Sequence, residues 1–329
     1  MLLKKTLFAA TTAVLATLAA GVVHAAPEKP ECIAPAKPGG GFDLTCKLVQ
    51  SGLHNGKFIA DPMRVTYMPG GIGAVAYNAI VAQRPDQANT IVAFSSGSLL
   101  NLAQGKFGRY NENDVRWLAA IGTDYGAITV AADSPYKTLK DVLAAVKADP
   151  TKVVFGAGGT VGSQDWMKAA LTARSAGVDP RAMRFVAFEG GGEALTALQG
   201  GHIHVFAGDA AEAQQQLKAG SKIRILAVMS DKRLPGELAN VPTAKEQGAD
   251  VEWPIIRGFY LGPKVSDADY KVWADTFSKM MASPEYEKLR TERGLFPLSM
   301  SGPEVDAFVK KQVNTYRTLV KDFGLATAK

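Results

Sequence analysis

The stretch Pro38-Gly39-Gly40-Gly41-Phe42-Asp43 decides how the rest of the chain is interpreted. It follows a short strand-like run at 31–36, and an amphipathic segment begins directly after it at Leu44. The stretch therefore predicts a strand-to-helix turn. Glycines at a helix N-terminus expose backbone N–H groups that have no partner within the helix, and the helix dipole favours negative charge there. The stretch thus predicts an anion-binding turn, although a flexible surface turn has the same composition.

Strand-like and helix-like segments alternate along the chain, and this pattern predicts α/β domains with mainly parallel sheets flanked by helices. In such sheets, ligands bind at the carboxyl ends of the strands. Five turns rich in glycine or hydroxyl residues fall at such ends, at 38–43, 69–73, 95–98, 156–163 and 189–193. They divide three and two between two blocks of the chain, so a cleft between two domains would collect all five. Because none contains Arg or Lys, an anion there would be held by N–H groups and hydroxyls.

Two details of this pattern concern the edges of individual elements. Separate strands are expected at 116–121 and 127–131, joined through 122–126. The last helix is expected over 303–323, with Ser301 and Glu304 as a capping box and Gly324 at its end.

The first 25 residues have the order of a secretory signal peptide and are excluded from the fold. Lys4 and Lys5 precede an apolar run at 7–23, which ends at the small-residue site Val23-His24-Ala25. The remaining chain of about 300 residues exceeds the usual size of one hydrophobic core, so two domains are expected. Without Lys4 and Lys5 the formal net charge falls from +6 to +4. The basic residues are scattered, which disfavours nucleic acid as a partner.

Cys32 and Cys46 are the two cysteines of the chain, and they flank the first glycine turn. In an exported protein, two cysteines most simply form one disulfide. Closing a loop of about 15 residues contributes about 3 kcal/mol in the chain-entropy model. The alternative is a thiol pair for metal or redox chemistry, but the close C-x-x-C spacing and a nearby His are missing.

Catalytic and cofactor motifs are incomplete. The run Gly71-Ile72-Gly73-Ala74-Val75-Ala76 fits the glycine spacing of a dinucleotide-binding turn, but the next strand, at 90–94, ends in serines instead of the required acidic residue. His202 and His204 would supply only half of a tetrahedral metal site, so a solvated strand face is the simpler interpretation. Carboxylates near the turns have no recognisable nucleophile to assist. The sequence therefore predicts no enzyme, no cofactor and no metal site.

Three segments in order carry a family resemblance: 32–46 around the first glycine turn, 158–165 (GGTVGSQD) and 188–194 (FEGGGEA). They resemble the TctC family, the periplasmic solute receptors of tripartite tricarboxylate transporters, also called Bug proteins. The resemblance covers essentially the whole mature chain. It implies a two-domain periplasmic-binding-protein (Venus-flytrap) fold with the ligand cleft between the domains. It also implies a periplasmic, monomeric receptor that closes on a small carboxylate and delivers it to a membrane permease of one large and one small subunit.

The resemblance further implies which residues hold the ligand. In the family, a ligand carboxylate is held largely by backbone amides and ordered waters of two matching turns. Carried over to this chain, the turns are Gly40, Gly41, Phe42 and Asp43 in the first domain and Gly158, Gly159, Thr160 and Ser163 in the second. The predicted ligand-binding residues also include several that stand at the ends of expected strands: Pro69, Gly70, Ser95, Ser96, Gly190, Gly191 and Asp209.

In the flytrap interpretation, 26–123 with 254–329 form the first domain and 124–253 the second. The chain then crosses between them near 122–126 and near 252–257, which would be the hinge. The cysteine pair resembles the subgroup nearer the citrate receptors, which favours citrate or another tricarboxylate as ligand. A dicarboxylate or an aromatic acid remains an alternative. Two other classes also stay open: an exported enzyme acting on a carboxylate, and a carboxylate sensor for a membrane kinase.

Overall fold

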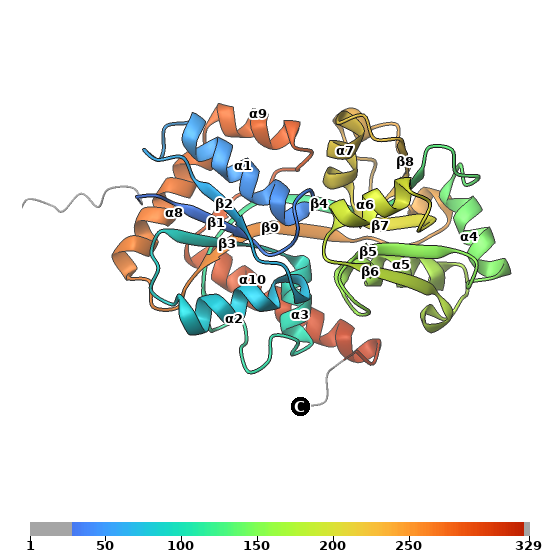
Figure 1. Ribbon diagram of the computed structural model, residues 1–329, viewed down its shortest axis with the longest axis horizontal. Coiled ribbons are helices and arrows are strands. Elements are labelled where there is room, and N and C mark those ends of the chain that lie inside the picture. Colours follow the sequence, from blue (N-terminus) through green and yellow to red (C-terminus); the bar gives the residue numbers. More distant parts are fainter. Residues whose placement is uncertain (1–27, 326–329) are drawn as a thin grey trace, which may run out of the picture.

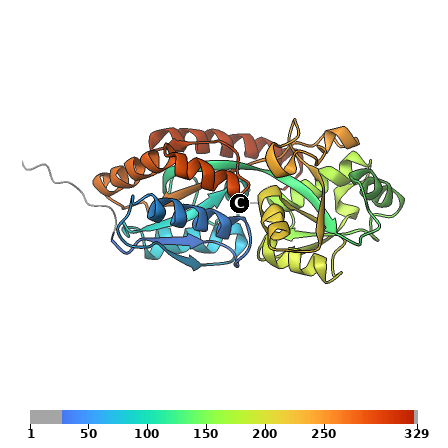
Figure 2. The same ribbon diagram turned by 90° about the horizontal axis from the view of Figure 1, so that it is seen from above.

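The computed structural model describes residues 28–325, which form two lobes that share one long strand (Figure 1). The predicted signal peptide lies outside the described residues. The long strand is β4 (Arg116–Ala131), and it runs from one lobe into the other beside β9 (Pro254–Leu261; Figure 2). Hydrogen bonding is therefore continuous from the sheet of lobe 1 to that of lobe 2.

Lobe 1 is built on the first half of β4 together with β9, β3, β1 and β2. The strands are β1 (Glu31–Ala34), β2 (Arg64–Tyr67), β3 (Thr90–Ser95) and the short β10 (Met300–Ser301), which pairs with β4. The helices on one face are α1 (Gly41–Asn55), α8 (Asp267–Met281) and α9 (Pro284–Glu292). Those on the other face are α2 (Ala74–Gln83), α3 (Ser96–Ala103) and α10 (Pro303–Asp322; Figure 1). Apolar side chains are buried on both faces of this sheet.

Lobe 2 is built on the second half of β4, to which β7 and β8 pair. Its strands are β5 (Val154–Gly158), β6 (Arg184–Phe188), β7 (Val205–Asp209) and β8 (Ile223–Val228). Its helices are α4 (Leu139–Ala148), α5 (Gln164–Ser175), α6 (Gly191–Gln199) and α7 (Ala210–Lys218). Four short 3-10 helices complete the described chain: η1 (Gly71–Gly73), η2 (Pro180–Ala182), η3 (Gly236–Leu238) and η4 (Lys245–Gln247).

The predicted α/β fold is confirmed, but the strand pairing is mixed and not mainly parallel. β1 pairs in parallel with β2 and β3, and β5 pairs in parallel with β6 and β7, as the strand–helix alternation predicts. In the middle, β9 and β4 pair antiparallel with each other and with their other neighbours. The outer strands of each lobe therefore present their carboxyl ends, and the glycine turns that follow them, to the space between the lobes.

Two predictions about element edges are wrong. The stretch 122–126 does not separate two strands, because it stays paired to β9, with Gly122 opposite Arg257 and Asp124 opposite Ile255. The register of this pairing shifts twice before Gly122. The capping box of the last helix does not form either. Ser301 belongs to β10, its hydroxyl is 2.5 Å from that of Ser278, and Gly302 stands at the N-cap. The predicted end of this helix is confirmed, with Gly324 in the left-handed region.

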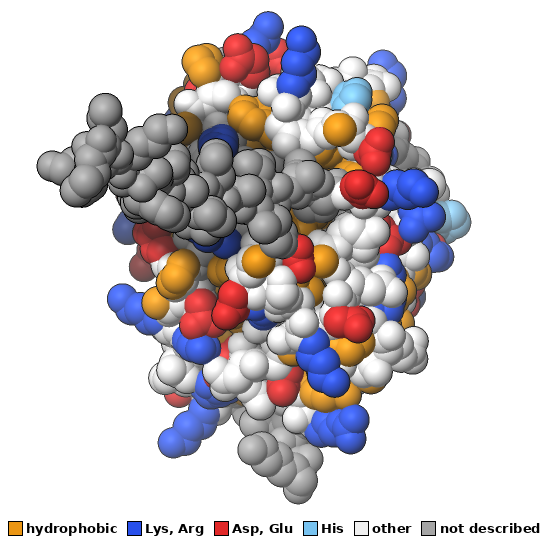
Figure 3. Space-filling model, turned by 90° about the vertical axis from the view of Figure 1, so that its left-hand side faces the viewer, with side chains coloured by type: hydrophobic (Ala, Val, Ile, Leu, Met, Phe, Trp, Pro, Cys, Tyr) orange, Lys and Arg blue, Asp and Glu red, His pale blue; other side chains and the backbone are white. Residues whose placement is uncertain are grey.

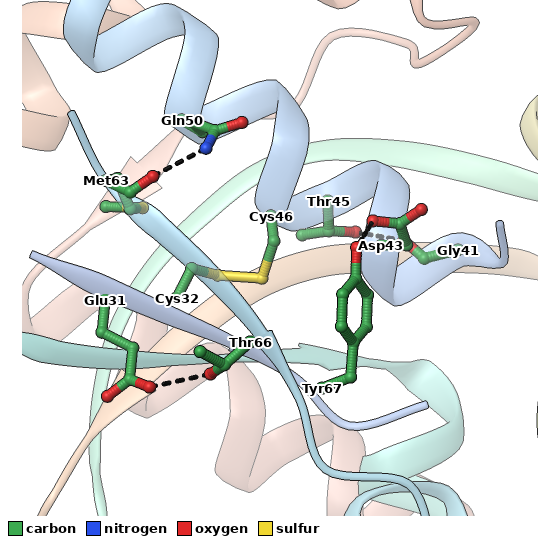
Figure 4. The surroundings of a disulfide bond; sticks show 10 residues. All are labelled: Glu31, Cys32, Gly41, Asp43, Thr45, Cys46, Gln50, Met63, Thr66 and Tyr67. Atoms are coloured by element: carbon green, nitrogen blue, oxygen red, sulfur yellow. Dashed lines mark hydrogen bonds between the residues drawn. A yellow bond between two sulfur atoms is a disulfide. The ribbon is translucent and has the colours of Figure 1, made fainter. Parts of the chain in front are cut away.

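The predicted disulfide is present and joins Cys32 of β1 to Cys46 of α1, with 5.8 Å between their Cα atoms (Figure 4). Both cysteines are fully buried. Since the first glycine turn lies between these two residues, the disulfide fixes the helix that starts at the turn against the strand that leads into it.

The part of the lobe 1 surface that Figure 3 shows carries described side chains of both charges. Figure 3 shows Lys and Arg side chains interspersed with Asp and Glu across the end of this lobe. Among the described residues, no helix is both long enough and apolar enough to cross a membrane.

Candidate ligand-binding site between the lobes

The first glycine turn of lobe 1 lies directly against the last glycine turn of lobe 2. A Cβ atom at Gly40 would be 3.2 Å from the backbone nitrogen of Gly191, and one at Gly39 would be 3.5 Å from the Cα of Gly192. Between them is a narrow space of about 30 Å³, called here the inner gap. Its lining residues are Ala36, Gly40, Gly41, Phe42, Ile72, Ser95, Gly158, Gln164, Asp165, Glu189, Gly190, Gly191, Asp209, Glu212 and Arg257.

A larger cavity of about 480 Å³, called here the outer cavity, opens beside the inner gap. It is lined by Lys37, Gly71, Ile72, Asn101, Lys106, Gly159, Thr160, Ala187, Phe188, Glu189 and Glu193. Ile72 and Glu189 line both spaces, so they stand at the boundary between them. The backbone of Ile72 is left-handed, with φ 52° and ψ 49°, which is unusual for a β-branched residue.

The predicted site residues fall into three groups. Eight line the inner gap: Gly40, Gly41, Phe42, Ser95, Gly158, Gly190, Gly191 and Asp209. Gly159 and Thr160 line the outer cavity. The other five, Asp43, Pro69, Gly70, Ser96 and Ser163, line neither space.

Asp43 holds the first turn in shape instead of facing the gap. Its carboxylate accepts hydrogen bonds from the Gly39 N–H at 2.8 Å, the Lys47 ammonium at 2.8 Å and the Tyr67 hydroxyl at 2.9 Å. Figure 4 shows the Tyr67 contact next to the disulfide. Three partners engage this carboxylate, so Asp43 is a structural support of the turn and lines neither the inner gap nor the outer cavity.

Two of the predicted hydroxyls have structural partners as well. The Ser163 hydroxyl accepts from the Trp166 N–H at 3.2 Å and so caps α5. The Ser96 hydroxyl accepts from the Ile256 N–H at 3.0 Å, which ties α3 to β9. These contacts position the walls of the site.

A buried charge cluster, which we define as Asp124, Asp165, Lys168, Asp209, Glu212 and Arg257, lies behind and beside the inner gap. Arg257 donates to Asp124 at 2.8 Å and to Asp209 at 2.5 Å. Lys168 is 2.7 Å from Asp165 and 2.5 Å from Asp209. The cluster thus joins β9 and β4 at the crossing between lobes to α5, β7 and α7 of lobe 2.

Two glycines of the turns make room for members of this cluster. A Cβ atom at Gly41 would lie 2.5 Å from Nη2 and 2.6 Å from Cζ of Arg257. A Cβ atom at Gly191 would lie 2.5 Å from Cδ of Glu212. The Arg257 guanidinium and the Glu212 carboxyl group therefore pack against the two turns, one on each side of the inner gap. Within the described chain, the Nε atom of Arg257 has no hydrogen-bond partner.

Burial and mutual repulsion shift the pKa values of the acids in this cluster in different directions. Burial raises the pKa of Asp165 to about 6, although Lys168 opposes the shift. Burial, together with the charges of Asp209 and Asp165, raises the pKa of Glu212 well above its usual value. Burial also acts on Asp209, but its ion pairs with Lys168 and Arg257 outweigh it and hold the pKa of Asp209 below its usual value. Asp209 is therefore the most strongly ionised of these three acids.

Sequence reasoning missed Arg257, Lys168, Asp124, Asp165 and Glu212 as site residues. It noted correctly that the five turns contain no cation, but β9 brings Arg257 to the first turn from elsewhere in the chain. One signal was available: Arg257 interrupts an otherwise apolar strand, and arginine is rarely buried unless it is paired. In residues 28–325 no group of three or more His, Cys, Asp or Glu side chains is placed to hold a metal ion.

The lobes touch around the mouth of the site. Lys37 and Glu193 form an ion pair of 2.7 Å across it. The Gln104 side-chain amide donates to the Gly162 carbonyl at 2.6 Å, and the Lys106 ammonium donates to the Val161 carbonyl at 3.0 Å. The structure is therefore a closed arrangement of the two lobes.

Two α/β lobes that close on a gap formed by a turn from each define the class of periplasmic solute-binding proteins. The family model described as "Tripartite tricarboxylate transporter family receptor" (TctC) matches residues 46–325. The chain belongs to this family, which confirms the resemblance seen in the sequence.

Known proteins similar to this chain include one of Cupriavidus necator, described as "UPF0065 protein in gbd 5'region". It is 25% identical over 291 residues, which cover 88% of this chain and 86% of that protein. Among solved structures, MatC from Rhodopseudomonas palustris with bound malate is 20% identical with a TM-score of 0.76, covering 89% of this chain and 98% of that one. Another R. palustris protein, solved with adipate, is 19% identical with a TM-score of 0.78, covering 91% and 98%. These two structures share the fold.

Proposed function

We propose that this chain is a periplasmic solute receptor that binds a small carboxylate and delivers it to the permease subunits of a tripartite tricarboxylate transporter. The observation that carries the proposal is the convergence of a glycine turn from each lobe, together with the Arg257 guanidinium, on one enclosed gap. Membership in a receptor family supports the transport role. The malate and adipate in the two similar structures support a carboxylate as ligand.

The helices that begin at the two turns explain how a carboxylate would be held. Gly40 and Gly190 are the N-caps of α1 and α6, and neither helix has a capping side chain. By contrast, Ser95, Thr138 and Ser163 cap α3, α4 and α5. The first-turn N–H groups of α1 and α6 are therefore left for a ligand, and both helix dipoles favour an anion at these ends.

Arg257 adds the full positive charge that the turns lack. Its guanidinium lies against Gly41, and its Nε–H group is without a hydrogen-bond partner among residues 28–325. Hydrogen bonds from an ionised donor to a carboxylate are about twice as strong as neutral ones. Asp43 acts indirectly, because it holds the Gly39 N–H and so fixes the shape of the turn.

The volumes of the inner gap and the outer cavity indicate which part of the ligand each space would hold. The inner gap, at about 30 Å³, is near the volume that one water molecule occupies in the liquid, whereas the outer cavity of about 480 Å³ is in the range of small-molecule sites. One carboxylate is anchored at the inner gap after a small separation of the lobes, and the rest of the ligand extends past Ile72 into the outer cavity. We favour citrate or another tricarboxylate, with a dicarboxylate or an aromatic acid as the alternative.

The same proposal assigns 26–123 with 254–329 to one domain and 124–253 to the other. The hinge is then the paired stretch where β4 and β9 cross between lobes. Opening at this hinge separates Lys37 from Glu193 and Gln104 from Gly162, so that the ligand can enter between the lobes. The receptor acts as a monomer in this proposal.

A thermal-shift panel on the mature protein at low salt tests the function. Citrate, tricarballylate, malate, adipate and benzoate are compared with neutral sugars. A ligand at about 100 times its Kd stabilises the folded state by about 2.7 kcal/mol, so at least one carboxylate should raise the Tm by several degrees. Failure of every carboxylate to raise the Tm, with a shift by an uncharged solute instead, would refute the proposal.

A Gly41→Ala variant tests the site. Alanine is accepted at the start of a helix, so the backbone is not strained, but the new methyl group displaces the Arg257 guanidinium from the first turn. Arg257 is buried and paired with Asp124 and Asp209, so the variant without ligand should also lose stability. Its response to ligand is therefore compared with its own ligand-free Tm, and we expect the ligand-induced rise to be lost. Carboxylate uptake by a strain that lacks the gene separates transport from the alternative of a sensor for a membrane kinase. A transport receptor predicts that uptake is lost, whereas a sensor predicts that uptake persists and that gene induction by the carboxylate is lost.

A further inference from the structure

Glu212 is the acid of the buried charge cluster that lacks a cation. Its Oε1 atom accepts a hydrogen bond from the Asp209 N–H at 3.1 Å, which closes the first turn of α7. Its carboxyl group lies against Gly191 and lines the inner gap. Among the described residues, Lys168 and Arg257 pair with the three aspartates of the cluster, and neither forms an ion pair with Glu212.

Within residues 28–325, the elements packed around α7 supply no further cation that pairs with Glu212. On α1, Asp43 and Lys47 pair with each other at 2.8 Å. On α6, Glu193 pairs with Lys37 near the surface. On β8, Arg224 donates to the carbonyl groups of Ala132 and Tyr136. Glu189 also lines the inner gap, but it is an exposed acid and supplies no positive charge. The buried charged groups that face Glu212 are therefore those of the buried charge cluster itself.

Charge counting shows what a bound carboxylate would meet. With all its members ionised, the buried charge cluster has four negative and two positive charges, a sum of −2. An additional carboxylate in the inner gap would bring the sum to −3 in a space with little water, where repulsion between like charges is strong. A neutral carboxyl group removes one of these charges and also supplies an O–H donor where an ionised one would repel the ligand.

We propose that Glu212 binds the ligand as a neutral carboxylic acid, so that the lobes take up a proton from solvent when they close on a carboxylate. The proton resides on Glu212, and its O–H group donates to a ligand oxygen opposite Arg257. This inference rests on the proposed function. It adds that the receptor recognises its ligand with one guanidinium and one protonated acid.

The direction of the pH effect follows from the burial of Glu212. In the closed structure, burial and the charges of Asp209 and Asp165 raise its pKa well above the usual value. Opening of the lobes returns water to the inner gap and brings that pKa down towards its usual range. A group whose pKa rises on closure stabilises the closed state at low pH, and this contribution is lost as pH rises through the higher pKa. Ligand affinity should therefore fall with rising pH.

Titration calorimetry on the mature protein with citrate, malate and adipate measures this linkage. Each ligand is titrated between pH 6.5 and 8.5 in buffers of low and high ionisation enthalpy, and the slope of observed heat against buffer enthalpy gives the protons taken up. We expect up to about one proton, and Kd to rise up to about tenfold per pH unit in the wild type. The same titrations with Glu212→Gln cancel any proton change of the ligand itself.

The Glu212→Gln variant keeps a hydrogen-bond donor but cannot titrate. Its Kd at pH 6.5 should lie within about threefold of the wild-type value, because the variant preserves the hydrogen-bond donor. A tenfold change in Kd would correspond to a loss of about 1.4 kcal/mol in binding free energy. Between pH 6.5 and 8.5 the Kd of the variant should change only as far as the titration of the ligand itself requires, and less than the Kd of the wild type. The exposed Glu304→Gln on α10 is the matched control and should take up protons like the wild type.

The outcomes separate this inference from the proposed function. If none of the three carboxylates binds to the wild type at pH 6.5, the carboxylate receptor is refuted and the inference falls with it. If one binds with the same proton uptake in the wild type and in Glu212→Gln, the function stands and the role of Glu212 is refuted. If Glu212→Gln abolishes binding at every pH, Glu212 acts as an anion and the inference is wrong.

Discussion

Replacing Lys168 by Met should destabilise the protein strongly, because Lys168 is fully buried between two carboxylates. Its ammonium lies 2.7 Å from Asp165 and 2.5 Å from Asp209, and its side chain is 0% exposed. Methionine has a similar length but no charge, so the two aspartates remain buried without this cation. Arg257 still reaches Asp209, whereas Asp165 loses the only cation that forms an ion pair with it among the described residues.

Removing one partner of a buried ion pair typically costs about 3–5 kcal/mol. The unfolding entropy near the midpoint is about 2.1 cal/mol/K per residue, which gives about 0.6 kcal/mol/K for a chain of about 300 residues. The expected fall in Tm at pH 7 is therefore about 5–8 °C.

The loss should be smaller at pH 5 than at pH 7. The pKa of Asp165 is already raised to about 6 in the presence of Lys168, and loss of the ammonium raises it further. Because the folded-state pKa then lies above the unfolded one, the folded variant binds an extra proton at pH 5 and is relieved of the unpaired charge. This relief disappears as pH rises through the folded pKa. Differential scanning calorimetry at both pH values measures the difference.

Lys271→Met is the matched control, since Lys271 pairs with Asp275 at 2.7 Å on the exposed face of α8. Their side chains are 73% and 53% exposed, and such helical pairs contribute only about 0.3–0.5 kcal/mol. Equal Tm losses for Lys168→Met and Lys271→Met, or a Lys168→Met loss that is greater at pH 5, would show that Lys168 does not balance buried negative charge.

Two further changes test the turn and the boundary between the two spaces. Replacing both Cys32 and Cys46 by Ala should lower the free energy of unfolding by about 3 kcal/mol, since the disulfide closes a loop over a sequence separation of 14. Denaturant unfolding measures this loss, and the wild-type protein treated with reductant should show a similar one. An unchanged unfolding midpoint in both would contradict the disulfide. Ile72→Gly should relieve about 1–2 kcal/mol of left-handed backbone strain while removing the side chain that contacts Gly159 of lobe 2. Stopped-flow displacement should then show severalfold faster ligand release with little loss of stability, and an unchanged release rate would exclude Ile72 as a barrier.

The glycine turns could be predicted because their signature is local in the sequence. The run 38–43, with its flanking strand and helix, contains all that makes the first turn, and the structure places Gly40, Gly41 and Phe42 at the inner gap. The cysteine pair was likewise close enough in sequence to suggest the disulfide that is present. The family resemblance then supplied the two-lobed fold.

The buried charge cluster could not be predicted in this way, because its partners are far apart in the chain. Arg257 is 133 residues from Asp124 and 48 from Asp209, and Lys168 is 41 from Asp209. Nothing local marks Arg257 as a partner of these acids. The prediction of a break in β4 was wrong for a related reason. Gly122 favours a loop locally, but pairing with β9 determines its conformation.

Arg257 joins the hinge to the site, and this placement bears on how binding and closure are coupled. The residue stands on β9 opposite Gly122 of β4, and its guanidinium contacts Asp124 of the crossing strand and Asp209 of lobe 2. In the proposed function, a ligand carboxylate adds a third anion to the same guanidinium. Since Asp209 also has Lys168, it can share Arg257 with the ligand without being left as an uncompensated charge. The second cation of the buried charge cluster thus explains how one arginine can hold the closed hinge and still serve the ligand.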